Sequence, residues 1–173
     1  MTLSHIFVKF LRCDKASSAI EFALVAPMFL AVVFSIFEVG YVFLTDLAME
    51  SSLANAARLI RTGQVSGTMN AAQFKTIICD NTFNLVNCDK INVEVDVFGD
   101  FESGTNLPSL FDDDGKLVNN QVFKAGSRDS IIVARTTYLY NIINPFGNVV
   151  QLSNYGDNQY LQVHVVAFKN EPF

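Results

Sequence analysis

Residues Ile20 to Leu44 read IEFALVAPMFLAVVFSIFEVGYVFL, and this stretch decides the fold of the chain. Between Phe22 and Leu44 the only charged residue is Glu38. As a helix, that run rises about 34 Å at ~1.5 Å per residue, enough to cross a hydrocarbon core of ~30 Å. A buried helix of a soluble domain is the alternative, but the apolar run is too long for it. We therefore predict a membrane-spanning helix, which Pro27 is expected to kink.

The two flanks of this run predict its orientation. Residues 1–16, MTLSHIFVKFLRCDKA, carry three basic residues and one acidic residue, and basic residues on a short flank hold that end in the cytoplasm. The part after the span is then expected outside the cytoplasm. A cleavable secretory signal would need an apolar run of about 7–15 residues followed closely by small residues. The first such site, Ala54-Asn55-Ala56, lies well beyond the run, which disfavours this alternative.

The helix is expected to continue beyond the membrane. The following residues, TDLAMESSLANAARLIRTG, contain good helix formers and no breaker before Gly63. We predict one continuous helix from Ser18 to Thr62, half in the membrane and half projecting from it. Small residues allow helices to approach closely in or near a membrane, and the projecting half is expected to have a face formed by Leu47, Ala48, Ser51, Ala54 and Ala57.

Residues 63–173 are enough for one small domain with its own core. A second helix is expected from Ala71 to Asn84, with Phe74, Ile77, Ile78 and Phe83 on its apolar side. The segment INVEVDVF, Ile91 to Phe98, alternates apolar and polar residues and predicts a half-buried strand. Further strands are expected over Ser130–Tyr140 and Tyr160–Phe168, with an irregular segment from Gly99 to Ser130 and a loop beginning at Asn144-Pro145. The predicted fold class is therefore α+β: a membrane helix continuing into a long exposed helix, then a short helix and an antiparallel sheet of three or more strands.

Composition and cysteine spacing limit the chemistry. The net charge is −5 and the basic residues form no cluster outside the N-terminus, which argues against nucleic-acid binding. Cys79 and Cys88 make a poor zinc site on their own, and neither His5 nor His164 completes one by a recognised motif. If the domain lies outside the cytoplasm, a short disulfide between Cys79 and Cys88 is the better interpretation.

The sequence contains no recognisable catalytic motif. Asp112-Asp113-Asp114-Gly115 lacks the ligand spacing and closing glutamate of an EF-hand loop. Glu21 and Glu38 are about 25 Å apart along one helix and cannot act as a paired acid and base. Glu38 is expected at the outer membrane interface, with contact to another subunit as the alternative. We expect neither an enzyme, nor a metal, a cofactor or a small-molecule substrate.

Glu21 at the cytoplasmic edge of the span is the residue that points to a function. An ionised carboxylate there is costly without a partner. With the short basic leader and the small-residue junction Ala16-Ser17, it resembles the class III signal of type IV pilins and pseudopilins. The segments SAIEFALVAPMFL and FEVGYVFLTDLAMESSLANAARLIRTG resemble the TadE/TadF-like minor pseudopilins of tight-adherence (Tad, Flp-type) pilus systems. The resemblance continues through the paired cysteines, INVEVDVF and GSRDSIIVARTTYLYNIINPF, so it spans most of the chain.

This resemblance implies a pilin-like fold and a role in pilus assembly and adhesion. A membrane-embedded prepilin peptidase would cut between Ala16 and Ser17, leaving Glu21 and Phe22 as mature residues five and six. Glu21 would then meet the N-terminal amine of a neighbouring subunit. The family most often has Gly before the cut, where this chain has Ala16. Expected partners are the peptidase, other pseudopilins and pilin, and the inner-membrane assembly platform.

The resemblance also implies an organisation and a location. It gives a cytoplasmic leader over 1–16, a transmembrane and protruding helix over 17–62, and a domain over 63–173. The protein would cross the bacterial inner membrane once, with the domain periplasmic or extracellular. An uncleaved accessory subunit that scaffolds the secretion machinery is the alternative, and an extracytoplasmic enzyme on a signal anchor is a more distant one.

Overall fold

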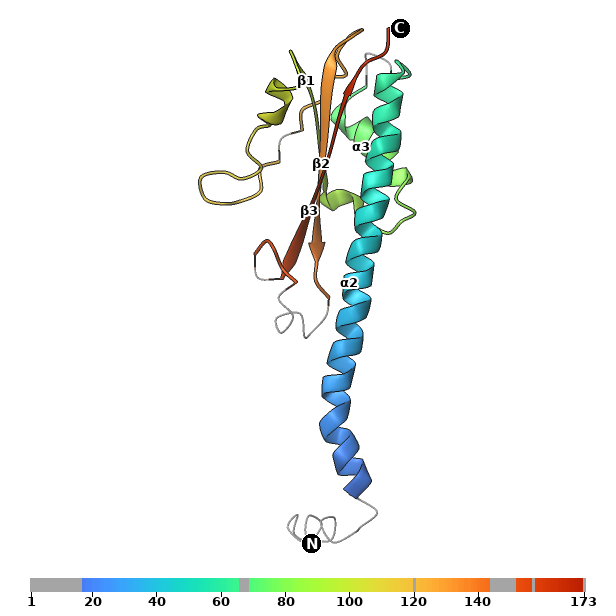
Figure 1. Cartoon of the computed structure of the whole chain (residues 1–173), viewed down its shortest axis with the longest axis vertical. Coiled ribbons are helices and arrows are strands. Elements are labelled where there is room, and N and C mark those ends of the chain that lie inside the picture. Colours follow the sequence, from blue (N-terminus) through green and yellow to red (C-terminus); the bar gives the residue numbers. More distant parts are fainter. Residues whose placement is uncertain (1–16, 66–68, 120, 144–151, 157, 173) are drawn as a thin grey trace.

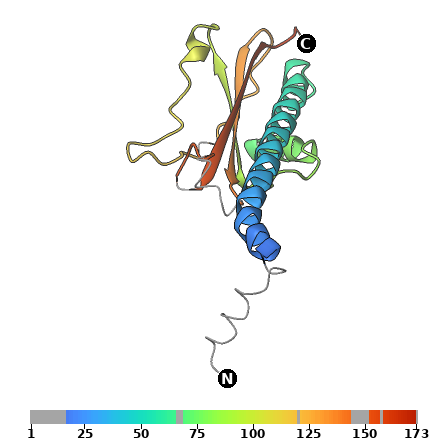
Figure 2. The ribbon, with the colours of Figure 1, turned by 60° about the horizontal axis from the view of Figure 1, so that its bottom comes forward.

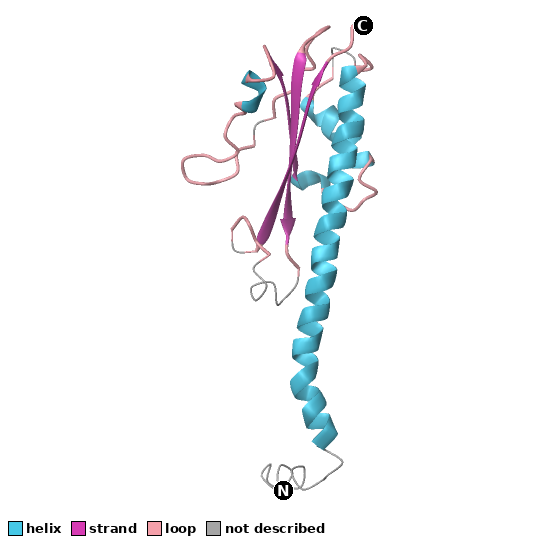
Figure 3. Cartoon of the chain, viewed as in Figure 1, coloured by secondary structure: helices cyan, strands magenta, loops and turns pink. Residues whose placement is uncertain are grey.

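A long helix packs along one face of a small antiparallel sheet and extends far beyond it (Figures 1 and 3). The computed structural model describes residues 17–65, 69–119, 121–143, 152–156 and 158–172. The leader and the loop beginning at Asn144-Pro145 therefore lie outside the described residues. Helix α2 runs from Ser17 to Arg61 and continues through Pro27, which confirms one long N-terminal helix. It ends in a Schellman arrangement, with Gly63 at φ +69° and Gln64 N donating to Leu59 O.

Helix α3, Ala71–Asp80, is shorter than expected. It begins with a capping box between Asn70 and Gln73. The expected continuation to Asn84 is wrong, because the Thr82 hydroxyl donates to Cys79 O and competes with further helical bonds. Phe83 and Asn84 follow at positive φ, and Phe83 is 83% exposed rather than part of the apolar side.

Three strands form one sheet in the order β1-β2-β3, and both pairings are antiparallel. Strand β1 covers Ile91–Phe98, β2 covers Ile131–Asn141 and β3 covers Gln159–Lys169. The bounds agree with the sequence prediction to within one residue. The register places Val95, Ala134 and Val166 side by side across the sheet.

The core lies between the inner face of the sheet and the two helices. Each large apolar side chain taken out of water there contributes about 1.5–3 kcal/mol. The upper half of α2 contributes residues at spacings of four, three and four, which form one helical stripe. The most deeply buried members are Met49, Leu53, Ala56 and Ile60 from α2, Phe74 and Ile78 from α3, and Ile91, Val93, Val95, Ile132 and Ala134 from the sheet.

The outer face of the sheet is covered over β1 and β2 by residues 99–119, the covering segment, which follows β1. In Figure 2 this segment, coloured yellow, lies on the side of the sheet opposite to α2. Arg135 on β2 is buried beneath it, paired with Glu94 of β1 and donating to Pro108 O at 2.9 Å. The ion pair joins two strands, and the bond to Pro108 fastens the covering segment to the sheet.

Candidate functional site on the long helix

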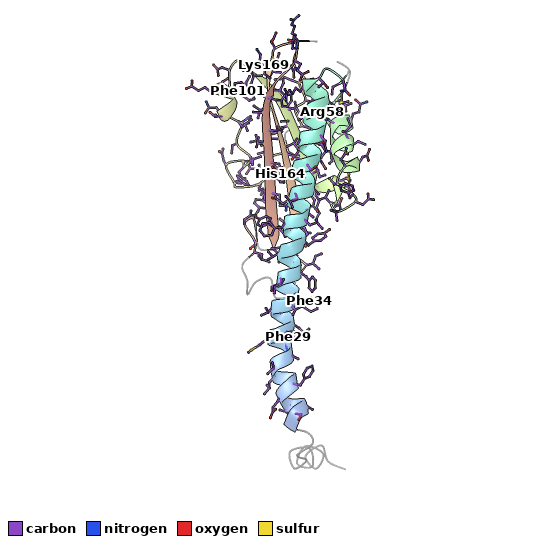
Figure 4. All side chains as sticks on the ribbon, turned by 45° about the vertical axis from the view of Figure 1, so that its right-hand side comes forward. Phe29, Phe34, Arg58, Phe101, His164 and Lys169 are labelled. Carbon is purple, nitrogen blue, oxygen red and sulfur yellow. A yellow bond between two sulfur atoms is a disulfide. The ribbon has the colours of Figure 1, made fainter. Side chains whose placement is uncertain are left out.

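The lower part of α2 carries large apolar side chains that no other described element covers. From residue 18 to residue 34 none is buried, and Phe22 and Met28 are more than 70% exposed. In Figure 4, Phe29 and Phe34 project from a stretch of helix that stands clear of the sheet. This stretch rises about 26 Å at ~1.5 Å per residue, close to the ~30 Å of a hydrocarbon core. Within the described part of the chain, Ser18–Arg61 is the one helix long and apolar enough to cross a membrane.

The residues expected to act in processing lie at the beginning of this helix. Ser17 is the first residue of α2, and Glu21 and Phe22 follow in its second turn, both exposed. Ala16 lies outside the described residues, so cleavage before Ser17 stays a prediction. Glu21 belongs to the beginning of α2, and this end of the helix lies far from the sheet (Figure 1).

Glu38 lies where the exposed lower part of α2 meets the domain, and its observed contacts are with residues near the end of β2. It is only 9% exposed and accepts hydrogen bonds from Tyr140 Oη at 2.5 Å and from Ile143 N at 3.0 Å. Glu38 therefore binds its own domain, and its expected position at the outer membrane interface stays a prediction. Burial raises the pKa of Tyr140 well above its ordinary value, and the bond to Glu38 raises it further. The phenol consequently remains a donor throughout the physiological range.

The polar contacts of Glu38 continue one turn further along the interface between α2 and β3. Gln162 Nε2 donates to Val42 O at 2.9 Å and to Thr45 Oγ1 at 3.1 Å. His164 Nε2 lies 3.4 Å from Asp46 Oδ1. His164 is buried, as expected for a packed residue, and burial lowers its pKa although Asp46 and Glu50 act in the opposite direction. The helix–sheet interface is thus polar near the exposed lower part of α2 and apolar above it.

The small residues expected on one face of the projecting helix are divided between two faces. Ala48 and Ala57 are buried against the domain, whereas Leu47, Ser51 and Ala54 are exposed. The expected single face is therefore wrong. Sequence spacing indicated small side chains but not which of them the sheet would cover.

The structure contains a disulfide between Cys79 and Cys88, with the two Cα atoms 5.8 Å apart. Cys79 lies near the end of α3, and Cys88 is the first residue of the 3-10 helix η2, Cys88–Lys90, which leads into β1. The bond thus fixes the second helix to the edge of the sheet.

The acidic run Asp112-Asp113-Asp114, within the covering segment, forms a turn. Asp112 Oδ1 accepts from Asp114 N at 3.0 Å and from Lys116 N at 2.7 Å. No group of three or more potential metal-ligating side chains occurs in the portion of the chain that the structure describes.

The exposed apolar helix and the domain built on its upper half are consistent with a single-pass membrane protein. The model of the family described as "TadE-like protein" matches residues 16–58, which is nearly all of α2 together with the residue before it. This match identifies the helix as TadE-like and supports a TadE-like protein of the tight-adherence pilus systems. Neither the curated proteins nor the solved structures gave a match. The family match indicates a structural component associated with a Tad pilus.

Proposed function

We propose that this protein is a minor pseudopilin that prepilin peptidase processes and that helps to build a Tad-type pilus used in adhesion. The observation that supports this most directly is the bare lower half of α2, whose exposed apolar side chains fall within the TadE-like match. A surface of that kind needs lipid before assembly and other helices afterwards.

Processing is the first step of the proposed function. Cleavage after Ala16 would leave a chain that begins at Ser17, which is also the first residue of α2. The cut removes three basic residues and one acidic residue, so the net charge changes from −5 to −7. Intact mass of the protein from host membranes, with and without the peptidase, tests this step. An N-terminal Met on protein from the host that has the peptidase would refute it.

Glu21 carries the second step. Cleavage creates an α-amine on each subunit, and in a low-dielectric environment this amine is the natural counter-charge for the Glu21 carboxylate of a neighbour. Glu21→Gln should insert into the membrane normally, because removing a charge from the edge of the span eases insertion. Its co-purification with pilus components should fall.

Glu102→Gln is the matched control, because Glu102 is an exposed carboxylate in the segment after β1 and lies on neither α2 nor β3. It should assemble like the unmodified chain. Wild-type piliation by the Glu21→Gln variant would reject the proposed role.

The proposed topology has the N-terminus in the cytoplasm and the domain outside the inner membrane. The basic leader and the disulfide support it, because disulfides persist in oxidising compartments. An accessory subunit that keeps residues 1–16 and scaffolds the machinery is the second candidate, and the same mass measurement separates the two. The proposed partners are the peptidase, other pseudopilins and pilin, and the assembly platform.

A further inference from the structure

Strand β3 has an open edge. Its neighbour in the sheet is β2, and the strand order of the described residues ends there. Leu161 N donates to Asn154 Oδ1, away from β2, while Asn170 N donates to Ser130 O on the β2 side. Backbone groups alternate in direction along a strand, so the N–H and C=O groups of residues 163, 165 and 167 point away from β2.

Asn154 covers only the beginning of this edge. Its side chain bonds both the N–H and the C=O of Leu161, and its own N–H donates to Gln159 O. Beyond Leu161 the described residues contribute no such cap. Exposed edges are usually blunted by charge, proline or a bulge, whereas this one carries Val163 and Val165, which are 41% and 52% exposed.

The outer side of the edge is apolar because the covering segment stops at β2. Val133 and Arg135 of β2 are buried beneath that segment, but Val163 and Val165 of β3 are not. An added strand would therefore find two β-branched side chains beside it on this face, which are favourable cross-strand neighbours.

The inner side of the edge is acidic. Asp46 and Glu50 of α2 both lie close enough to His164 of β3 to act on its charge. Asp46 is 45% exposed, and neither carboxylate pairs with a lysine or arginine among the residues the structure describes. Asp46 also lines an apolar hollow of about 170 Å³ between α2 and the start of β3, with Phe43 and Tyr160 among its walls. A docked strand would meet negative charge and an apolar recess on this side.

The direction of β3 argues against a second copy of β3 as the occupant. Val42 contacts Gln162 and Asp46 contacts His164. Further along, Arg61 O accepts from Glu171 N, just beyond β3, so α2 and β3 run in the same direction. Two copies anchored in one membrane would hold their β3 strands parallel. If a two-fold axis along the membrane normal related the copies, each edge N–H would face the identical N–H of the other copy. Two strands arranged in this way cannot form a hydrogen-bonded ladder.

We propose that the edge of β3 from Val163 to Lys169 binds an extended segment of a different protein, in which β-branched residues alternate with lysine or arginine. The backbone of the segment pairs with residues 163, 165 and 167. Its apolar side chains lie beside Val163 and Val165, and its basic side chains face Asp46 and Glu50. This is β-strand addition to a sheet edge, and it does not depend on the processing of the N-terminus.

Amide hydrogen exchange of the full-length protein in detergent micelles tests the proposal. The probe is the acetylated, amidated peptide TVKVKVT, and TVEVEVT is the control of equal strand propensity and opposite charge. Without peptide, the amides of residues 163, 165 and 167 should exchange rapidly while those of 162, 164 and 166 are protected. TVKVKVT should protect all three exposed amides, and TVEVEVT should not.

Two variants separate the backbone and charge contributions. Val165→Pro removes an edge amide that takes no part in the β2–β3 ladder, so it should abolish peptide binding while the thermal transition is retained. If that variant does not fold, Val165→Lys places a charge on the same edge and should weaken binding of the lysine peptide. Asp46→Asn with Glu50→Gln should weaken it roughly three- to tenfold, the size expected for two exposed ion pairs.

Three outcomes would overturn the proposal. Protection of residues 163, 165 and 167 without peptide at low protein concentration would mean that the chain covers its own edge. Protection without peptide that grows with protein concentration would assign the edge to self-association. Equal protection by TVEVEVT would show that the acidic pair does not select the occupant.

Discussion

Replacing Tyr140 by Phe should loosen the domain from the long helix, because it removes a donor to the buried carboxylate of Glu38. The Oη···Oε1 distance is 2.5 Å and Glu38 is 9% exposed, so water replaces the lost donor poorly. Hydrogen bonds to charged groups contribute about 1.5–3 kcal/mol, and we expect the free energy of unfolding to fall by that amount. Ile143 N would remain as a donor to the carboxylate, which should keep the loss below the upper end of that range.

A double-mutant cycle isolates the contact. Glu38→Gln keeps the shape and an acceptor oxygen but removes the charge, so Tyr140→Phe should cost only about 0.5–1.5 kcal/mol in that background. The coupling energy should therefore be about 1 kcal/mol. The assay is denaturant unfolding of the full chain in detergent micelles, followed by circular dichroism.

Tyr138→Phe provides the matched control for this cycle. The Tyr138 hydroxyl accepts from Asn87 N at 3.4 Å instead of binding Glu38, so its loss should add to that of Glu38→Gln within about 0.5 kcal/mol. Additivity of Tyr140→Phe with Glu38→Gln would refute the contact as we describe it.

Two further changes test other parts of the fold. Replacing Cys79 and Cys88 by Ser should lower the free energy of unfolding by roughly 2–3 kcal/mol, because the bond closes a loop between residues separated by nine positions. Thiol labelling before and after reduction tests whether the disulfide is present. Free labelling without reductant would contradict both the disulfide and the proposed topology. Since burial lowers the pKa of His164, the unfolded chain binds the proton more readily, so stability should fall as the pH drops below about 6.5 towards the folded pKa. His164→Gln should remove that part of the pH dependence in unfolding measured between pH 5 and 8, and an unchanged profile would contradict it.

Local sequence patterns predicted most of the fold. The apolar run and the absence of a breaker before Gly63 located α2, and strict alternation in INVEVDVF located β1. Apolar periodicity predicted the wrong end for α3. The helix stops where the Thr82 side chain bonds to the backbone, and the spacing of apolar residues up to Phe83 gives no sign of that bond. The outcome at Phe83 shows that an apolar residue near a helix end can belong to the turn that follows.

The contacts of Glu38 and the open edge of β3 could not be predicted in this way. Tyr140, the partner of Glu38, lies 102 positions further along the chain, and a local sequence pattern cannot predict a contact between residues so far apart. The exposure of Val163 and Val165 depends on where the segment after β1 stops across the sheet. Alternation along β3 alone cannot show which of its faces is covered.

No linker separates the exposed lower half of α2 from its buried upper half. The two halves form one continuous helix and therefore rotate together about its axis. Met49 and Leu53 are packed in the core, while Phe29 and Phe34 project from the lower half of the helix (Figure 4). Each residue turns an α-helix by about 100° and lengthens it by ~1.5 Å. The number of residues between Phe34 and Glu38 therefore fixes the angle about the helix axis between β3 and the exposed side chains of the lower half. Any contact that prevents the lower half from rotating about its axis therefore also fixes the direction in which the sheet faces.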